Sequence, residues 1–294
     1  MFPLSLLDMQ PFVKSLSSAL HLLGFFSSER QAWGVTELAK RTGLHKSQVS
    51  RILRTFVTHG FIQKNPDNRE YRLGRAFLLY ASLIRSDDEI RRLARPYMEK
   101  LNGETQGTVF LKVREAGETV TIDRIESQHL LRLTQPVGLR LPLNATSSGK
   151  VFLAYMSVQE VRELFQQDGF RRFTVKTKVD LTKLDEEFVE IRRRGFAVSH
   201  EEYMLGTWGV AAPIFSSKRA VVATIGLGLP IVLFPKKRVV ELGIAVRRAA
   251  ERISVLLDAK PRRNNGSNHA RLSVPIVNRT NTKKGSKNEE RQRA

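Results

Sequence analysis

The most regular hydrophobic pattern of the chain lies between residues 35 and 61. Apolar side chains recur there at intervals of three and four residues, at Val49, Ile52, Leu53 and Phe56. This spacing predicts an amphipathic α-helix with one apolar face. The opposite face is polar and basic and carries Ser47, Arg51, Arg54 and Thr58.

A shorter helix is expected just before it, over residues 36–42. Thr36 is the expected N-cap, Leu38 and Ala39 would pack inward, and Gly43 can adopt the left-handed conformation that ends the helix. A short helix, a glycine turn and a basic-polar helix follow the order of a helix-turn-helix. The pair alone is modest evidence, because amphipathic helices with exposed arginines are common.

The flanking segments complete a winged helix. Residues 61–63 and 71–73 are expected to be short strands, and the turn-rich residues 64–70 between them predict a β-hairpin. Residues 14–26 predict the first helix of the unit, with three leucines on one face, Leu16, Leu20 and Leu23.

The next segment, residues 75–86, is helical in pattern and apolar nearly all round, so it needs a partner surface. It either packs on its own domain or forms a contact between two copies of the chain. We favour the contact between copies, because helix-turn-helix proteins read two half-sites through two-fold symmetry.

The outward face of the second helix carries side chains that can read DNA. Arginine can form a forked contact with guanine, and glutamine with adenine. We therefore expect Ser47, Gln48 and Arg51 to contact base edges, while the other candidates hold the backbone and position the helix. The expected DNA-contacting residues are Thr36, Lys46, Ser47, Gln48, Ser50, Arg51, Arg54, Lys64 and Arg69.

Helices and hairpin strands are mixed in the rest of the chain. Helices are expected at 87–102, 146–156, 158–167, 181–194 and 235–257, and strands at 108–114, 119–125, 131–134, 196–198, 210–215 and 221–229. This order predicts an α+β domain with an antiparallel sheet.

Positive charge is concentrated at the two ends of the chain. The formal net charge is +20, of which residues 1–80 carry +6 (eleven Lys and Arg against five Asp and Glu) and residues 260–294 carry +8 (ten against two). This distribution favours an anionic partner, nucleic acid before membrane. The polar tail from 260 to 294 is expected to be disordered, and it either attracts DNA non-specifically or is merely solvated.

Composition narrows the classes further. The chain has no cysteine, which excludes disulfides, a thiol nucleophile and a Cys-based zinc site. Its N-terminus has no basic residues before the apolar ones, and no apolar run approaches the roughly 20 residues of a membrane span. We therefore expect a soluble, cytoplasmic protein that associates with the nucleoid and not with a membrane.

No motif for catalysis or for a bound cofactor or metal stands out. Residues 147–150 are similar to the end of a phosphate-binding loop, but that motif needs Gly at 144 and Ser or Thr at 151, where the chain has Asn144 and Val151. His200 and the two glutamates after it match no zinc spacing. We expect no catalytic residues, no metal and no cofactor.

Several motifs, in order, resemble the IclR family of bacterial transcription regulators, over about residues 14–258. The helix-turn-helix carries ELAKRTGLHKSQVSRIL, and the wing carries GFIQKNPDNREYRLG. Further motifs are LARPYMEKLNGET, QPVGLRLPLNATSSGKVFLA and RRRGFAVSHEEYMLGTWGVAAPIF.

The resemblance implies a winged-helix domain (1–74), a linker helix used in dimerisation (75–86), a GAF/PAS-like effector-binding domain (87–259) and the basic tail (260–294). Family members are usually dimers or tetramers. They repress or activate small operons for catabolism, often in response to organic or aromatic acids. The sequence leaves the operator, the effector and the direction of regulation open.

By the same resemblance, the effector-binding residues are Ala145, Ser147, Ser148, Ser199, His200, Thr207, Trp208, Gly209, Gly226 and Gly228. Serines at a helix start offer N–H groups and hydroxyls to a carboxylate. The chain departs from the family pattern where Gly209, Gly226 and Gly228 replace more polar residues. We therefore expect a roomier, less polar pocket and an effector larger or more apolar than a small keto-acid, for example an aromatic one, unless this member has lost its effector.

Two rival classes remain. An enzyme domain fused to a DNA-targeting module would need a catalytic motif, and none is found. A ligand-blind, basic DNA-binding protein would show weak sequence preference and steep salt dependence. The size of the second domain argues against that reading, because a simple DNA clamp does not need it.

Overall fold

The structure is a computed structural model that describes residues 13–27, 29–86 and 89–259 of the 294 residues. The predicted basic tail, residues 260–294, lies outside the described residues. We refer to residues 13–74 as the winged-helix region and to residues 89–259 as the sheet region.

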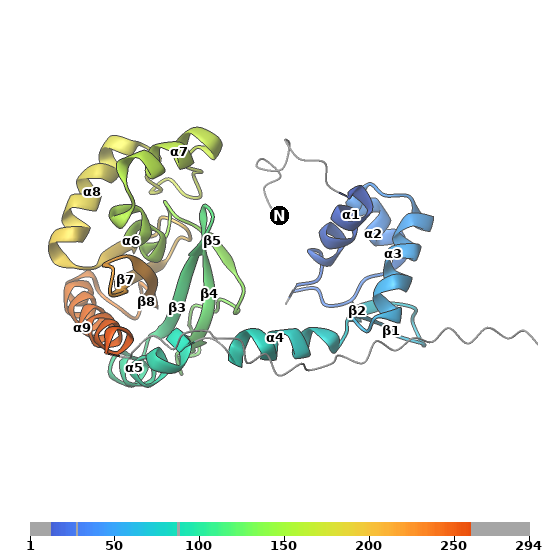
Figure 1. Cartoon of the computed structure of the whole chain (residues 1–294), viewed down its shortest axis with the longest axis horizontal. Coiled ribbons are helices and arrows are strands. Elements are labelled where there is room, and N and C mark those ends of the chain that lie inside the picture. The colour runs from blue at the N-terminus through green and yellow to red at the C-terminus, as the bar shows by residue number, and fades with distance from the viewer. Residues whose placement is uncertain (1–12, 28, 87–88, 260–294) are drawn as a thin grey trace, which may run out of the picture. The chain divides into compact units, whose positions relative to one another are not determined.

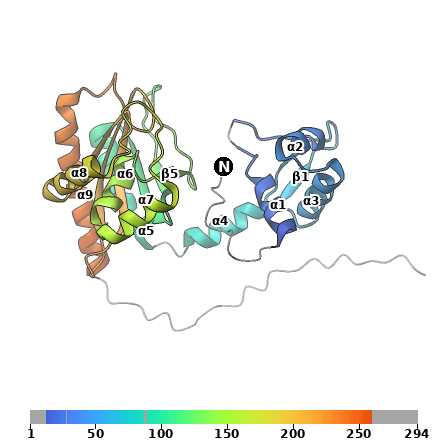
Figure 2. The ribbon, with the colours of Figure 1, turned by 90° about the horizontal axis from the view of Figure 1, so that it is seen from above.

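The winged-helix region contains three helices and a hairpin (Figure 1). These are α1 (Lys14–Leu23), α2 (Val35–Thr42), α3 (Lys46–Thr58), β1 (Ile62–Lys64) and β2 (Tyr71–Leu73), and the two strands pair antiparallel. The helices gather around β1 (Figure 2). The predicted winged helix-turn-helix is therefore confirmed.

The core of this region contains the residues that the helical periodicity indicated. Val49 and Leu53 of α3 are fully buried, and they pack in one cluster with Leu22 and Leu38. Gly43 has a φ of 71° and ends α2, as predicted, because this left-handed conformation is easily reached without a Cβ. Helices α2 and α3 therefore pack on a common core, and this packing holds α3 in place.

Two details differ from prediction. Thr36 is not the N-cap of α2, because the N-cap lies two residues earlier, at Gly34 in extended conformation. The helix begins at Val35, and Thr36 lies exposed in its first turn. In α1 the core contact comes from Leu22, whereas Leu16 and Leu20 are 57% and 56% exposed. Of the predicted leucine face, only Leu23 packs against the core, where it is partly buried.

Helix α4 (Ala76–Ser86) follows the wing at the predicted place. Part of it packs on its own winged-helix region. The ring of Phe61 meets Phe77 edge-on at 5.1 Å and stacks on Tyr80 at 5.6 Å. Leu78 and Leu79 remain 69% and 48% exposed. One side of α4 thus packs on its own domain through Phe77 and Tyr80, and the exposed Leu78 and Leu79 leave a contact between two copies of the chain as a prediction.

The sheet region is built on a six-stranded antiparallel sheet with the order β5-β4-β3-β8-β7-β6. The strands are β3 (Thr108–Glu115), β4 (Glu118–Ile125), β5 (Arg140–Pro142), β6 (Ala197–His200), β7 (Thr207–Phe215) and β8 (Val221–Pro230). This is the predicted α+β fold with an antiparallel sheet, and its class is confirmed.

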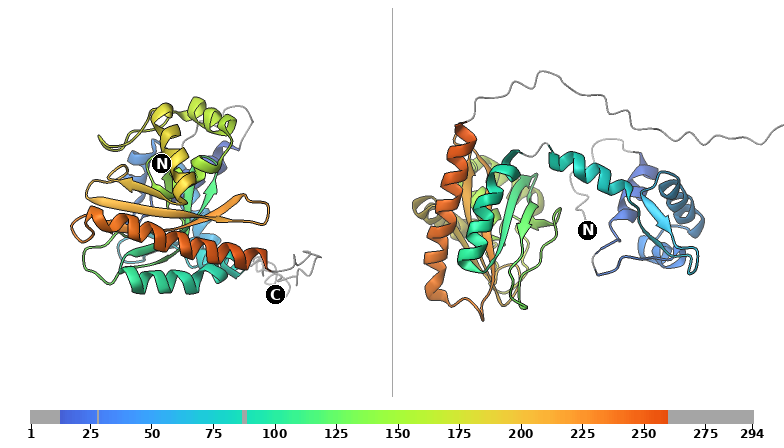
Figure 3. Two further views of the ribbon diagram at one scale, coloured as in Figure 1. Left: turned by 90° about the vertical axis from the view of Figure 1, so that its left-hand side faces the viewer. Right: turned by 90° about the horizontal axis from the view of Figure 1, so that it is seen from below.

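Helices cover both faces of this sheet. On one face α5 (Glu89–Thr105) and α9 (Val239–Asp258) run side by side (Figure 3). On the other lie α6 (Ser147–Tyr155), α7 (Val158–Asp168) and α8 (Leu181–Arg194), and the short 3-10 helix η1 (Lys236–Arg238) precedes α9. The sheet therefore forms the middle layer of three.

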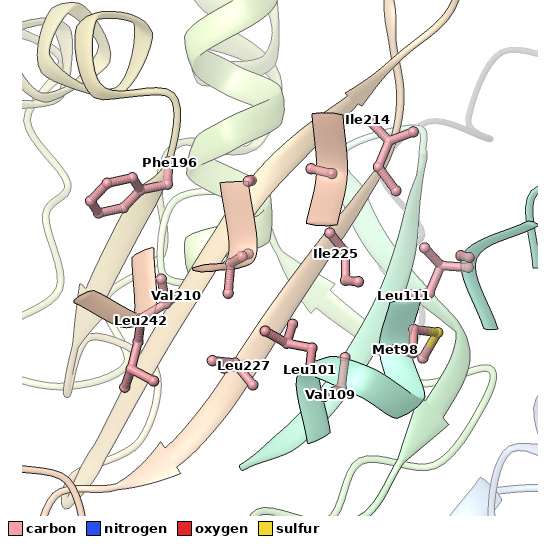
Figure 4. Close-up of a cluster of buried hydrophobic side chains, with 14 of the residues drawn as sticks. Met98, Leu101, Val109, Leu111, Phe196, Val210, Ile214, Ile225, Leu227 and Leu242 are labelled. Atoms are coloured by element: carbon pink, nitrogen blue, oxygen red, sulfur yellow. The ribbon is translucent and has the colours of Figure 1, made fainter. Parts of the chain in front are cut away.

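Alternate strand residues supply the core under α5 and α9. Val109, Val210 and Leu227 point into it from three neighbouring strands, and Met98 of α5 and Leu242 of α9 meet them (Figure 4). Because side chains alternate along a strand, the residues between them face α6. That second face holds the cavity described below.

The predicted strand at residues 131–134 is wrong. These residues form an irregular segment, and the edge of β4 pairs instead with β5, with Thr119 opposite Leu141. Residues 131–134 have the composition of a strand, but the free edge of β4 pairs with β5, which lies closer to α6 in the sequence.

Candidate functional site

The exposed face of α3 is polar and positively charged. Lys46, Ser47, Arg51 and Arg54 are exposed, opposite the buried apolar side of the helix. Gln48 and Ser50 lie half-buried on its flanks. The Ser47 hydroxyl lies 2.9 Å from Nδ1 of His45, which holds it at the start of the helix.

The charge around this helix is of one sign. Residues 38–66 contain six Lys and Arg and no Asp or Glu. The preceding acid, Glu37, forms an ion pair with Arg30, whose guanidinium lies 3.8 Å from the centre of the Trp33 ring. Glu37, the acid in the first turn of α2, is thus paired with a cation, which leaves a surface suited to phosphate.

The wing carries two further cations. Lys64 and Arg69 are both exposed, one at the end of β1 and the other in the turn. Arg69 has a φ of 58°, and the turn is closed by the side chains of Asn65 and Asn68, which accept the N–H groups of Asp67 and Glu70. The turn is therefore locally hydrogen-bonded and presents its basic residues outward.

A cavity of about 60 Å³ lies between the sheet and the start of α6. Nine of the ten residues expected from the family resemblance line it: Ala145, Ser147, Ser148, Ser199, Thr207, Trp208, Gly209, Gly226 and Gly228. Nine other lining residues were not among those ten: Phe110, Lys112, Leu133, Gln135, Thr146, Tyr203, Met204, Val210 and Leu227.

The start of α6 forms the polar end of the cavity. Thr146 caps the helix, and its hydroxyl accepts the N–H of Gly149 at 3.1 Å. Ser147 and Ser148 are more than nine-tenths buried, yet their hydroxyls and N–H groups make no hydrogen bond with any described residue. We call these two serines and their N–H groups the α6 cup. Its donors and the helix dipole suit a carboxylate.

The three glycines do not open the cavity as expected. A Cβ on Gly209 would lie 2.9 Å from the Ser147 hydroxyl, and one on Gly228 would lie 2.8 Å from the Phe110 ring. At Gly226 it would meet the Val210 carbonyl at 2.5 Å. Neighbouring atoms already occupy the space beside each glycine, so these positions do not make the pocket roomier, and the glycines instead allow close packing around the α6 cup.

His200 and the ring of Trp208 lie away from the cavity. The register pairs them across β6 and β7, and their rings stack at 4.0 Å. Trp208 belongs to the core under α5 and α9, and its Nε1 has no hydrogen-bond partner among the described residues. Burial, followed by Lys176, lowers the pKa of His200. The strand alternation therefore directs Ser199 and Gly209 to the cavity and these two rings elsewhere.

Lys112 of β3 is the unexpected charged residue of the cavity. It is 4% exposed, and its Nζ donates to Oε1 of Gln135 at 2.8 Å. Burial lowers its pKa to about 7. One signal could have found it, namely a single lysine inside the otherwise apolar run from Val109 to Val113.

A second buried lysine, Lys150, ties α6 to the strands. Its Nζ donates to Glu187 and Glu202, each at 2.7 Å, and to the Val198 carbonyl at 2.6 Å. Burial raises the pKa of Glu202, and Lys150 offsets this only in part. At Glu187 burial also acts upward, but Lys150 and Lys178 outweigh it and the pKa is lowered. This network fixes the helix that carries the α6 cup.

Within the described ranges, no group of three or more His, Asp or Glu side chains is arranged to hold a metal ion. Of the helices in the part of the chain that the structure describes, none has the length and hydrophobicity needed to span a bilayer.

A winged helix with a basic reading face, joined to a domain with a partly open cavity that has a polar end, defines a ligand-responsive DNA-binding regulator. Comparison with known families agrees. Residues 15–66 match the IclR helix-turn-helix domain, and residues 83–255 match the bacterial transcriptional regulator IclR C-terminal domain. The chain belongs to the IclR family of bacterial transcriptional regulators.

Individual relatives cover most of the chain. The transcriptional repressor IclR of Escherichia coli (strain K12) is 31% identical over 246 residues, 83% of this chain and 89% of that protein. The HTH-type transcriptional regulator KdgR of the same strain is 31% identical over 251 residues, 84% and 94% of the two chains. These relatives are regulators, and the chain is a transcriptional regulator and not an enzyme.

Solved structures show the same fold. The Thermotoga maritima IclR has a TM-score of 0.69 at 26% identity, covering 83% of this chain and 98% of that one. An IclR homologue from Microbacterium hydrocarbonoxydans, complexed with 4-hydroxybenzoate, has a TM-score of 0.70 at 24% identity with the same coverage.

Proposed function

We propose that the chain is a repressor that reads its operator through α3 and releases or tightens it when a small carboxylic acid enters the cavity. The E. coli relative named a transcriptional repressor supports this direction of regulation. The division into residues 1–74 for DNA, 75–86 as linker and 87–259 for the effector belongs to the proposal. A DNA-binding regulator of a bacterial family acts where the chromosome lies, in the cytoplasm.

On DNA, we assign base reading to Ser47, Gln48 and Arg51. Their support is the exposure of Ser47 and Arg51 on the side of α3 away from its core, with Gln48 half-buried on the flank of that side. Contacts of cations and hydroxyls with phosphate position a helix without specifying sequence, and to such contacts we assign Thr36, Lys46, Ser50, Arg54, Lys64 and Arg69.

The assembly is proposed to be a dimer through α4. Leu78 and Leu79 are the support, because two large apolar side chains on one short helix remain exposed after its other side has packed on Phe61. A two-fold dimer would present two α3 helices to two half-sites.

The observation that carries the effector assignment is the α6 cup. Two serines more than nine-tenths buried, with hydroxyls unpaired among the described residues, face a cavity at a helix N-terminus. The cavity volume of about 60 Å³ is room for about four to six waters, at roughly 10–15 Å³ each. This size favours an aliphatic acid of a few carbons over the aromatic effector expected from the sequence, and over the 4-hydroxybenzoate bound by the Microbacterium homologue.

Calorimetric titration of the full chain tests this assignment. Pyruvate and other short acids should bind, whereas 4-hydroxybenzoate should bind weakly or not at all. Ser147→Ala should weaken acid binding about tenfold or more, because hydrogen bonds to a charged group contribute roughly 1.5–3 kcal/mol. Ser217→Ala, an exposed serine away from the cavity, is the matched control. Preference for 4-hydroxybenzoate, or binding indifferent to Ser147→Ala, would overturn the assignment.

A further inference from the structure

The effector cavity has a second polar end, separate from the α6 cup. Lys112 reaches it from β3 and is 4% exposed. Its polar contact is the neutral amide oxygen of Gln135 at 2.8 Å, and the face of Phe110 lies 5.2 Å from its Nζ. Neither neighbour carries a charge that could balance an ammonium group.

The strands on either side of Lys112 extend this polar end. The register places it opposite Thr121 of β4 and Thr224 of β8. Both threonines are fully buried, and neither hydroxyl has a hydrogen-bond partner among the described residues. A row of three polar side chains thus crosses the sheet beside the cavity with its hydrogen-bonding capacity largely unused, which is uncommon in folded proteins.

The other buried lysine of the sheet region shows what a purely structural cation looks like here. Lys150 is fully buried and is balanced by two carboxylates, Glu187 and Glu202. No Asp or Glu is among the residues that line the cavity around Lys112. A buried charge is costly unless it is paired. Lys150 therefore has carboxylate partners, whereas the wall of the cavity offers none to Lys112.

We infer that the effector supplies this anion, and that it is a small dicarboxylate with one carboxylate in the α6 cup and the other at Lys112. The inference rests on the proposed function and narrows its ligand class from carboxylic acids to dicarboxylic acids. The small cavity limits the spacing of the two groups to a short carbon chain.

Protonation of Lys112 follows from the same contacts. Burial holds its pKa at about 7, so near neutral pH the ammonium form is only partly populated. An incoming carboxylate stabilises the ammonium form, so binding takes up a proton, and affinity falls as pH rises above 7. Tyr203 is the one other titratable side chain among the residues found to line the cavity, and Thr121 and Thr224 on the flanking strands do not titrate.

The test compares acids that differ only by a carboxylate. Succinate and butyrate share a four-carbon chain, and glutarate and valerate extend the series by one carbon. Each is titrated calorimetrically into the full chain at pH 6.5 and pH 8.5, in two buffers of different ionisation enthalpy so that proton uptake is measured. Lys112→Met removes the charge while keeping an extended apolar side chain, and Lys218→Met, an exposed lysine, is the matched control.

We expect at least one dicarboxylate to bind about tenfold or more tighter than its monocarboxylate partner, since a charge-assisted hydrogen bond is gained. That advantage should shrink at pH 8.5. In Lys112→Met both the advantage and the proton uptake should vanish, while Lys218→Met should behave as the native chain. Lys112→Gln, if Lys112→Met unfolds, gives the same reading.

Monocarboxylates that bind as well as dicarboxylates, with no effect of Lys112→Met, would overturn the dicarboxylate inference and leave the small-acid effector standing. Absence of binding by every acid of the series and by pyruvate would overturn the small-acid effector itself.

Discussion

Replacing Lys150 by Met should destabilise the sheet region by about 3–5 kcal/mol at pH 8, the usual cost of removing one partner from a buried ion pair. Lys150 is fully buried and donates three hydrogen bonds of 2.6–2.7 Å. Glu187 keeps Lys178 as a partner at 2.7 Å after the substitution. Glu202 loses its ion-pair partner, and its second oxygen already has no partner among the described residues.

The loss should depend on pH in a defined direction. Burial already raises the pKa of Glu202, and removing Lys150 raises it further. At every pH between the raised pKa of the native chain and the still higher pKa of the variant, the folded variant holds a proton on Glu202 that the folded native chain has lost. Both values lie above the unfolded pKa of about 4.3. Within that window the deficit of the variant should shrink by up to about 1.4 kcal/mol for each unit by which pH is lowered.

Tryptophan fluorescence isolates this effect in the full chain. The sequence has two tryptophans, Trp33 in the winged-helix region and Trp208 in the sheet region. In a Trp33→Phe background, urea unfolding followed by the remaining Trp208 reports the sheet region at fixed protein concentration. Lys176→Met is the control, because its ion pair with Glu201 is partly exposed and should contribute less than about 1 kcal/mol. A deficit for Lys150→Met no larger than that of the control, or one that grows as pH falls, would refute the reasoning.

Other consequences can be measured on the same chain. Arg51→Ala should lower the preference for operator over random DNA by about 1–3 kcal/mol, because a forked base contact is lost. Lys64→Ala should weaken the binding of both DNAs alike. Equal losses of affinity for both variants on both DNAs would contradict the division between base and backbone contacts. Leu78→Asp should convert a dimer to monomers in light scattering, and an undiminished dimer would exclude α4 as the contact. Between pH 7 and 9 the free energy of unfolding of the native chain should rise by about 2 kcal/mol relative to that of Lys112→Met. In this range Lys112 has lost its proton in the folded chain, where its pKa is about 7, but keeps it in the unfolded chain, where its pKa is near 10.4. A difference in urea unfolding that does not change with pH would argue against a desolvated lysine.

Local patterns were enough to predict the DNA-binding unit. The apolar positions of α3 lie on one face whatever surrounds them, and Gly43 and the turn-rich wing are likewise properties of short segments. Even here the N-cap predicted at Thr36 was wrong by two residues, because the extended backbone that precedes the helix is at Gly34. The inward face of α1 could not be predicted from its own sequence, because Leu22 is buried by residues from α2, α3 and the hairpin.

The effector cavity needed three-dimensional pairing. The family resemblance brought nine of the ten expected residues to it, but the role of the glycines depended on the Phe110 ring and the Ser147 hydroxyl, which come from distant segments. His200 was assigned to the cavity without knowing that the β6–β7 register sends its ring to Trp208. Lys112 was missed because its significance lies in what surrounds it across three strands.

Fluorescence anisotropy with labelled DNA tests the central claim most directly, that the chain reads a sequence and responds to an acid. DNA from upstream of the chain's own gene is compared with scrambled DNA of equal length at two salt concentrations, with and without succinate. We predict binding to the upstream DNA that survives the higher salt, is reduced to the scrambled level by Arg51→Ala, and shifts its midpoint when succinate is added. Equal binding to both DNAs that collapses with salt and ignores the acid would contradict the account and would indicate that basic charge alone holds the DNA.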